Sequence, residues 1–242
     1  MADKKLHLCV FGAHVGDAEI TAGATVCKYT QAGHKATIIH LTPGEKGHPS
    51  LSPEKYREQK IKEAHESAKI MGADVRILDY KDGELPNSEE VKLQVCDIIR
   101  EIKPDIVITH WKGSFHKDHI TCHHVVMEGV FYAAVPGIQR PLPAHPIRLM
   151  YFAENWEDPF DYKPNVWLDV SPVFEQWREA LRKHALFRSE VASFDYWRYY
   201  EGLVNMRGAE VGVKQAQTFM VPPISQKYLF HWFPIDQSML IF

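Results

Sequence analysis

Short hydrophobic segments alternate with amphipathic ones along the first half of the chain. The hydrophobic segments lie at residues 6–11, 35–41, 75–78 and 105–109. Continuous hydrophobic runs of this kind are typical of strands that are buried on both faces of a parallel sheet. The amphipathic segments between them predict helices that connect one strand to the next. We therefore expect an α/β fold with a mostly parallel sheet and right-handed crossover connections.

Capping residues mark the ends of two of these helices. Ser52 and Pro53 have the order that is typical of a helix start, and Gly72 is placed to end the same helix. Asn87 or Ser88 can cap the next helix. These signals predict helices from residue 53 to about residue 71, and from about residue 88 to about residue 102.

The pattern changes beyond residue 136. A proline-rich loop over 136–146 precedes predicted strands at 149–153 and 166–170, and Ser171 and Pro172 then mark a helix start. The tail from Phe187 is rich in aromatic residues and has no clear period. Because no linker or repeat separates these parts, we expect a single domain over residues 1–242. Its part from about residue 137 is expected to cover the same sheet.

Composition and charge narrow the classes of partner. The 242 residues include 28 Lys and Arg against 31 Asp and Glu, and the net charge of −3 disfavours a surface for nucleic acid or anionic membranes. Residues Met1 to Lys5 do not resemble a signal peptide, and no hydrophobic run is long enough to span a membrane. We expect a cytoplasmic protein that binds a small molecule. Assembly into a homo-oligomer stays open.

Two polar clusters follow predicted strands. His14 and Asp17 come after the first strand, and His116 and His119 come after the fourth. The carboxyl ends of parallel strands share one edge of a sheet, so the two clusters should meet there. His14, Asp17 and His119 form a set that suits a catalytic Zn²⁺ ion with one open position, and iron or another divalent ion is the alternative. These residues could instead cap helices and fill polar turns, but two clusters at one edge favour a metal site.

The sequence around these clusters resembles the LmbE/PIG-L family of zinc-dependent N-deacetylases. The family motif Ala-His-Pro-Asp-Asp-Glu is similar to Ala13-His14-Val15-Gly16-Asp17-Ala18-Glu19, and the motif His-Pro-Asp-His is similar to His116-Lys117-Asp118-His119. Weaker agreement extends over nearly the full chain. The resemblance implies a Rossmann-like three-layer sandwich with the metal at the carboxyl ends of the strands. It also implies an enzyme that removes an acyl group, most simply acetyl, from the amide nitrogen of an amino sugar or a similar small molecule.

The resemblance assigns roles by position in the two motifs. It implies that His14, Asp17 and His119 hold Zn²⁺. His116 would polarise the amide carbonyl or stabilise the developing oxyanion, and Asp118 would hold His116 in orientation.

Three further positions match residues that shape or contact the substrate pocket in the family. These are Glu45, Asp82 and Lys60, which stands where the family often has an arginine. Lysine cannot replace the bidentate recognition that an arginine provides. Glu45 could also be a solvated loop carboxylate, and Asp82 could serve only to form the turn before Gly83.

Gly16 is the main departure from the family. Active members have here an aspartate that takes a proton from the attacking water, and loss of a general base typically costs on the order of 10²–10⁴-fold in rate. The candidates for a substitute base are Glu45, His48, Asp118 and His116, while Glu19 is expected to point away from the metal.

Two alternatives to an active deacetylase follow. The first is a metal-binding family member that has lost or altered its hydrolytic activity and acts as a binding or regulatory module. The second is a metal-free protein that binds a nucleotide or sugar. It is less favoured, because no glycine-rich phosphate-binding motif follows any predicted strand.

Overall fold

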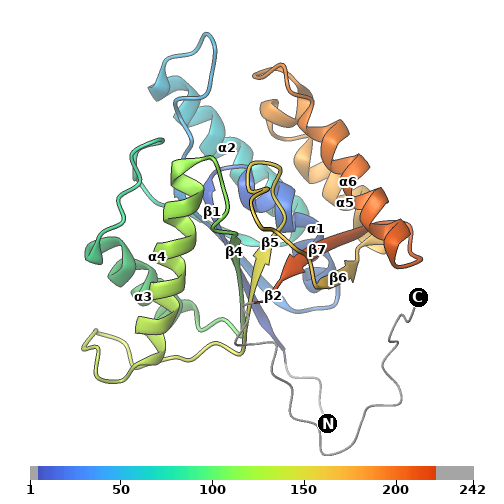
Figure 1. Ribbon diagram of the computed structural model, residues 1–242. Helices are drawn as coiled ribbons and strands as arrows, with labels where there is room; N and C mark the ends of the chain where they lie inside the picture. The colour runs from blue at the N-terminus through green and yellow to red at the C-terminus, as the bar shows by residue number, and fades with distance from the viewer. Residues whose placement is uncertain (1–4, 222–242) are drawn as a thin grey trace, which may run out of the picture.

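The computed structural model describes residues 5–221. The predicted absence of a signal peptide concerns mostly residues 1–4, which lie outside this part. One sheet of seven strands runs through the middle of the molecule in the order β3-β2-β1-β4-β5-β7-β6 (Figure 1). The strands are β1 (His7–His14), β2 (Lys35–Thr42), β3 (Asp74–Ile77), β4 (Ile106–His110), β5 (Leu149–Ala153), β6 (Val166–Asp169) and β7 (Ala216–Met220).

The first five strands are parallel. In the register of the central strands, Val10 of β1 pairs with Ile38 of β2 on one side and with Ile108 of β4 on the other. β7 is antiparallel to both β5 and β6. Chain order changes direction at β1, since β2 and β3 lie on one side of it and β4 on the other. The carboxyl end of β1 therefore lies at a switch point, where ligands bind in open α/β sheets.

Helices cover both faces of the sheet (Figure 1). α3 (Glu89–Ile102) and α4 (Lys117–Ala134) lie on one face, and α1 (Asp17–Gln31), α2 (Pro53–Met71), α5 (Phe174–Leu181) and α6 (Tyr196–Glu210) lie on the other. The 3-10 turns η1 (Ser171–Val173) and η2 (Ala185–Arg188) flank α5. Each face has its own hydrophobic core. The predicted α/β fold with three layers and a mostly parallel sheet is confirmed.

Local sequence explains where α2 and α3 begin and end. The Ser52 hydroxyl accepts a hydrogen bond from the Lys55 N–H, and Gly72 ends α2 in the left-handed conformation with a φ of 71°. Ser88 caps α3 in the same way as Ser52 caps α2. Both helices therefore lie where their capping residues predict them.

The C-terminal part contributes more to the sheet than the sequence predicts. We expected it to cover the sheet, but β5, β7 and β6 extend the sheet itself. β7 gave no hydrophobic signal because it contains Gln217, whose side chain is buried and accepts hydrogen bonds from Thr25 N–H and Oγ1. α6 gave no clear period because only three of its residues, Tyr200, Val204 and Gly208, are buried.

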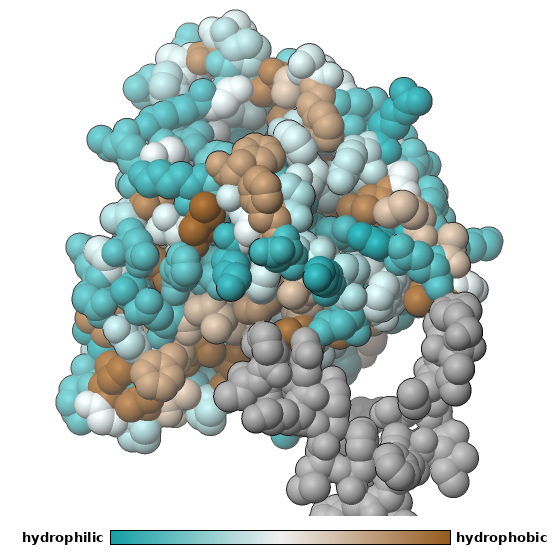
Figure 2. Space-filling view, viewed as in Figure 1, coloured by the Kyte–Doolittle hydropathy of each residue, from teal (hydrophilic) through white to brown (hydrophobic). Residues whose placement is uncertain are grey.

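The surface fits the balanced charge of the chain. Figure 2 shows a face that is mostly hydrophilic, with hydrophobic residues in separate small groups. Within residues 5–221, none of the helices combines the length and the apolar character needed to cross a membrane. The four cysteines are buried and unpaired.

Candidate metal centre and active site

The turn between β1 and α1 depends on Gly16 and Glu19. Gly16 has a φ of 108°, a conformation that glycine adopts without strain. Its N–H donates to Glu19 Oε2 at 3.0 Å, and Glu19 Oε1 lies 3.0 Å from His40 Nε2. Glu19 is fully buried, and its hydrogen bond to the Gly16 N–H stabilises the turn. It therefore points away from the site, as expected, and the turn places His14 and Asp17 at the carboxyl edge of the sheet.

The second turn leads from β4 into α4. His116 occupies the N-cap position of α4, and its Nδ1 accepts a hydrogen bond from the Asp118 N–H at 3.2 Å. The His116 N–H in turn donates to Ser114 Oγ at 2.9 Å. With Nδ1 acting as an acceptor, the proton of the neutral ring is on Nε2.

The two turns meet because β1 and β4 are neighbours. Asp17 Oδ2 lies 3.2 Å from His14 Nδ1 and 3.3 Å from His119 Nε2. In three groups, one ligand atom from each residue lies within 4.8 Å of the others: His14 with His116 and His119, Asp17 with His110 and His119, and His14 with Asp82 and Asp118. The predicted set of His14, Asp17 and His119 is divided between the first two groups. Imidazole and carboxylate donors at this spacing fit a divalent metal ion.

His110 and Asp158 complete the centre, and sequence reasoning missed both. His110 Nε2 accepts a hydrogen bond from the Ala13 N–H at 3.1 Å, and its ring stacks on that of His119 with 4.0 Å between centroids. The buried Asp158 carboxylate lies 3.2 Å from His110 Nδ1 and 3.1 Å from His119 Nδ1. A carboxylate behind a ligating histidine fixes its tautomer and orientation.

Asp17 is electrostatically suited to a cation. Burial raises its pKa, but the adjacent His119 and His14, with the His110 ring 3.3 Å from Asp17 Oδ2, bring the pKa of Asp17 well below its usual value. Burial lowers the pKa of His119, but Asp17 and Asp158 outweigh it and raise that pKa to about 9. The carboxylates thus favour positive charge at this point, whether from protons or from a metal ion.

Asp118 contacts a different histidine from the one expected. Its carboxylate lies 3.2 Å from His14 Nε2 and accepts hydrogen bonds from the Gly83 N–H at 2.6 Å and the Leu85 N–H at 3.3 Å. Only its backbone N–H reaches His116. The structure therefore corrects the expected contact: the Asp118 carboxylate orients His14, and its backbone orients His116.

The three predicted substrate-pocket residues occupy different places. Asp82 lines the cavity, with Oδ1 3.3 Å from His14 Nε2. Lys60 also lines it, but its buried Nζ donates to the Val15 carbonyl at 2.7 Å. Glu45 does not line the cavity, and its Oε1 accepts from the Asp82 N–H at 3.1 Å. The structure thus places Glu45 behind Asp82 rather than in the pocket.

Glu157 is the acidic residue of the cavity that the sequence did not indicate. It follows β5, lines the cavity, and has its Oε2 3.5 Å from His119 Nδ1. Burial raises its pKa, and the nearby charge of Asp17 adds to this effect, while His119 opposes it. The polar residues Glu154, Asn155, Glu157 and Asp158, which come directly after a predicted strand, were the signal that could have revealed it. Of the four predicted substitute bases, only His116 lines this cavity.

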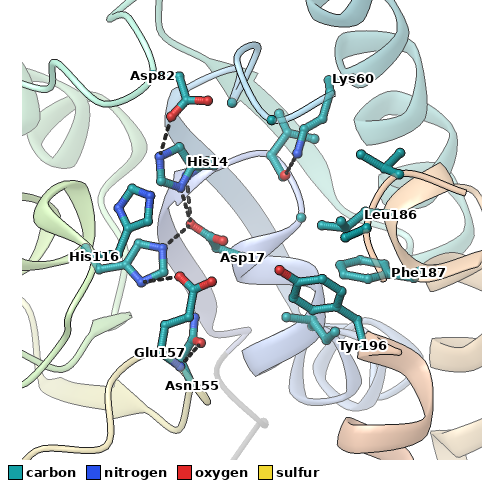
Figure 3. A pocket seen from close by; sticks show the side chains of 18 of the residues that line it. His14, Asp17, Lys60, Asp82, His116, Asn155, Glu157, Leu186, Phe187 and Tyr196 are labelled. Atoms are coloured by element: carbon teal, nitrogen blue, oxygen red, sulfur yellow. Dashed lines mark hydrogen bonds and ion pairs between the residues drawn. The ribbon is translucent and has the colours of Figure 1, made fainter. Parts of the chain in front are cut away.

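The cavity has a volume of about 180 Å³ and two unlike walls. His14, Asp17, Asp82, His116 and Glu157 lie on one side, and Leu186, Phe187 and Tyr196 lie on the other (Figure 3). The polar wall comes from the segments after β1, β3, β4 and β5, whereas the apolar wall comes from the segment around η2 and the start of α6.

Comparison with known proteins identifies the family of the chain. The chain is 29% identical over 212 residues to diacetylchitobiose deacetylase of Thermococcus kodakarensis, an alignment that covers 82% of this chain and 74% of the relative. It is 22% identical over 226 residues to 4-oxalmesaconate hydratase of Pseudomonas putida, covering 87% and 84%. The solved structure of N,N'-diacetylchitobiose deacetylase from Pyrococcus horikoshii superposes with a TM-score of 0.79 at 24% identity, covering 91% of this chain and 85% of that one. The family model described as PIG-L, GlcNAc-PI de-N-acetylase, matches residues 9–130, and the chain belongs to this family.

Proposed function

We propose that the protein is a zinc-dependent hydrolase that removes an acyl group from the amide nitrogen of an amino sugar or a similar small molecule. The observation that carries the proposal is the meeting of His14, Asp17 and His119 beside His116 in one cavity. Membership in the PIG-L family and the likeness to diacetylchitobiose deacetylase support the reaction class.

We propose His14, Asp17 and His119 as the protein ligands of the metal, and Zn²⁺ as the ion. Nitrogen and oxygen donors in this ratio suit a catalytic zinc site. A bound divalent ion would polarise the amide carbonyl and lower the pKa of water. His110 and Asp158 would keep the ligands in place through the hydrogen bonds described above.

His116 is proposed to act on the carbonyl oxygen. Its ring lies next to those of His14 and His119, with centroids 4.7 Å from each. Because Nδ1 is occupied by the Asp118 N–H, Nε2 is the atom that can donate a hydrogen bond to the developing oxyanion. Burial and the charges of His14 and His119 lower the pKa of His116, so the ring is neutral near pH 7 and donates as a neutral imidazole.

Glu157 is proposed to take the proton of the attacking water. Gly16 has no side chain for this task, and Glu157 is a cavity-lining carboxylate beside the ligand His119. A carboxylate whose pKa is raised by burial is a better proton acceptor than an ordinary one. The same group can then pass the proton to the leaving amine.

The test is release of free amine from N-acyl glucosamines by the zinc-loaded protein. Wild type is expected to turn over, and His14→Ala and His119→Ala are expected to lose both the metal and the activity. His124→Ala is the matched control, because His124 is exposed on α4 and should retain both. Undiminished metal in both ligand variants would rule out the proposed metal site.

A second candidate reaction is addition of water to a carbon–carbon double bond. Two observations favour it. Gly16 leaves no carboxylate at the position of the family's general base for hydrolysis, and the chain is related in sequence to a hydratase. Loss of ultraviolet absorbance from conjugated dicarboxylic acids, without any release of amine from N-acyl sugars, would support this reaction over the hydrolase. A zinc-loaded protein inactive in both assays would favour the non-catalytic module.

The cytoplasmic location and a possible homo-oligomer remain predictions from sequence. Cell fractionation and analytical ultracentrifugation of the full chain test them.

A further inference from the structure

The ring of Phe187 lies against the turn that carries the metal ligands. A Cβ built on Gly16 would be 3.3 Å from Phe187 Cζ and 3.9 Å from Cε2. Gly16 immediately precedes Asp17 in the sequence. The place that a base would take from this position is therefore bordered by an aromatic ring, and the apolar wall begins directly beside the proposed metal site.

Apart from the Tyr196 hydroxyl, which points into the cavity in Figure 3, the side chains of the apolar wall cannot form hydrogen bonds with a substrate. Leu186, Phe187 and Val191 line the cavity together with the aromatic ring of Tyr196. Phe187 packs on Tyr196 with 6.1 Å between ring centroids, which links the wall into one surface. Figure 3 shows Leu186, Phe187 and Tyr196 facing His14 and Asp17 across the cavity.

The two walls would sort the two parts of an N-acyl substrate. The hydroxyl groups of an amino sugar need hydrogen-bond partners, which Asp82 and Glu157 on the polar wall can supply. The acyl substituent has no such need and gains from apolar contact. When the substrate carbonyl lies beside His116 and the proposed metal ligands, the acyl substituent lies next to Phe187.

The size of the cavity exceeds what a methyl group requires. Its volume of about 180 Å³ is shared between the polar and the apolar wall, and the whole space is slightly larger than the roughly 150 Å³ of an engineered apolar cavity that binds benzene. An acetyl group would leave much of the apolar wall in contact with water. A larger acyl group would bury it.

We propose that the preferred substrate carries an apolar acyl group larger than acetyl, which lies on the wall formed by Leu186, Phe187, Val191 and Tyr196. The proposal rests on the proposed hydrolase function and names its substrate class. The reaction is still hydrolysis: the C–N bond breaks, water supplies hydroxyl to the acyl carbon, and a proton goes to the amine.

The experiment compares kcat/KM of the zinc-loaded protein on N-acetyl-, N-butyryl- and N-phenylacetylglucosamine. Burial of each added methylene improves binding by about fourfold, so we expect the phenylacetyl substrate to exceed the acetyl one by about tenfold or more. Phe187→Ala should reduce this ratio at least about fivefold. Because Phe187 is also part of the hydrophobic core, the half-buried Leu186→Ala is the second variant, with the same expected direction.

Phe131→Ala is the control, since Phe131 is 63% exposed on α4 and does not line the cavity. It should keep the wild-type ratio. Equal or better turnover of the acetyl substrate, or an unchanged ratio in both pocket variants, would overturn the substrate class while the hydrolase function stands.

Failure of the function itself gives a different result. If none of the three substrates releases amine, calorimetric titration of the zinc-loaded protein with acetate and phenylacetate decides the inference. Tighter binding of phenylacetate that is lost in Leu186→Ala would support the apolar subsite without the hydrolase. Equal binding of the two acids would overturn it.

Discussion

Asp158 Oδ1 lies 3.1 Å from Nδ1 of His119, so that Nε2 of the same ring faces Asp17. This contact holds the ring in the tautomer that a metal ligand needs, with its proton on Nδ1. We expect Asp158→Asn to weaken metal affinity about 10–100-fold, as loss of such an outer carboxylate typically does. Competition titration against a chromophoric chelator measures the effect.

Asp161→Asn is the matched control for this change. Asp161 follows Asp158 in the same loop but is exposed, and its substitution should leave the affinity unaltered. Equal affinity in the wild type and Asp158→Asn would show that the hydrogen bond to His119 does not support metal binding.

His116→Ala should retain the metal and lower kcat by about 10²-fold or more, because the hydrogen bond to the oxyanion is lost. Lys117→Ala, an exposed neighbour, should keep the wild-type rate. Metal content, thermal melts and steady-state kinetics on the same preparations separate the possible roles. A folded His116→Ala enzyme with undiminished kcat would contradict the role at the carbonyl.

Glu157→Gln should lower kcat by about 10²-fold if Glu157 accepts the proton of the attacking water. It should also remove from the pH–rate profile the ionisation that reports the base. Glu154→Gln serves as the control, because Glu154 precedes the same loop but pairs with Arg207. An unaltered pH–rate profile in Glu157→Gln would mean that the proton goes elsewhere.

Gly16→Asp tests whether a base can be restored at the usual family position. With a φ of 108° and Phe187 at 3.3 Å, the new side chain meets both backbone strain and a neighbouring ring. We expect a loss of stability of about 1–3 kcal/mol and no gain in turnover. Urea unfolding and kinetics check both effects.

Gly16→Ala separates strain from charge in this experiment, since it adds a Cβ without a carboxylate. Similar destabilisation in the two variants would support the steric explanation. A stable Gly16→Asp enzyme with turnover raised tenfold would show that the turn adapts and that the missing base limits the wild type.

Two buried histidines make stability depend on pH. Burial lowers the pKa of His123 to about 4, and burial also lowers that of His184 to about 4. Their unfolded pKa is about 6.5, so the unfolded chain binds more protons than the folded one between pH 6.5 and 4. The free energy of unfolding should therefore fall as the pH decreases through this window. Each histidine should contribute a slope of about 1.4 kcal/mol per pH unit.

His123→Gln should reduce the pH dependence of the free energy of unfolding by about 1.4 kcal/mol per pH unit, the contribution of one histidine. His124 is exposed, and His124→Gln should leave this pH dependence unchanged. Urea unfolding at a series of pH values, with a chelator present to remove effects of metal release, gives the slopes. Identical slopes in His123→Gln and wild type would show that His123 is protonated in the folded state at these pH values.

The sequence predicted best the parts of the fold whose signals are local. The hydrophobic runs of β1, β2 and β4 stand out because helices cover both faces of these strands, so every position is buried except the first residue of β1 and of β2. β7 was not predicted because it contains the buried Gln217, whose Oε1 accepts hydrogen bonds from Thr25 of α1. That partner is distant in sequence, and no local pattern reveals it.

The same distinction applies to the site. His14, Asp17, His116 and His119 stand in two short motifs, and the structure brings the motifs together at adjacent strands. Asp158 and Glu157 come from a third segment after β5, and their role depends on how that loop packs against the segment between β4 and α4. The position of Phe187 against Gly16 depends on packing between distant segments, which hydrophobic periodicity does not encode.

The turns that carry the proposed metal ligands and the apolar wall belong to separate segments of this chain. The turns after β1 and β4 are anchored in the middle of the sheet, while Leu186, Phe187 and Val191 lie in a segment outside it. Substitutions at Leu186 or Val191, which lie outside the sheet, can reshape the cavity next to the proposed metal site, whereas Phe187 also supports the turn at Gly16. A scaffold of this kind allows selectivity to diverge among descendants of one ancestor while the chemistry of the centre is inherited unchanged.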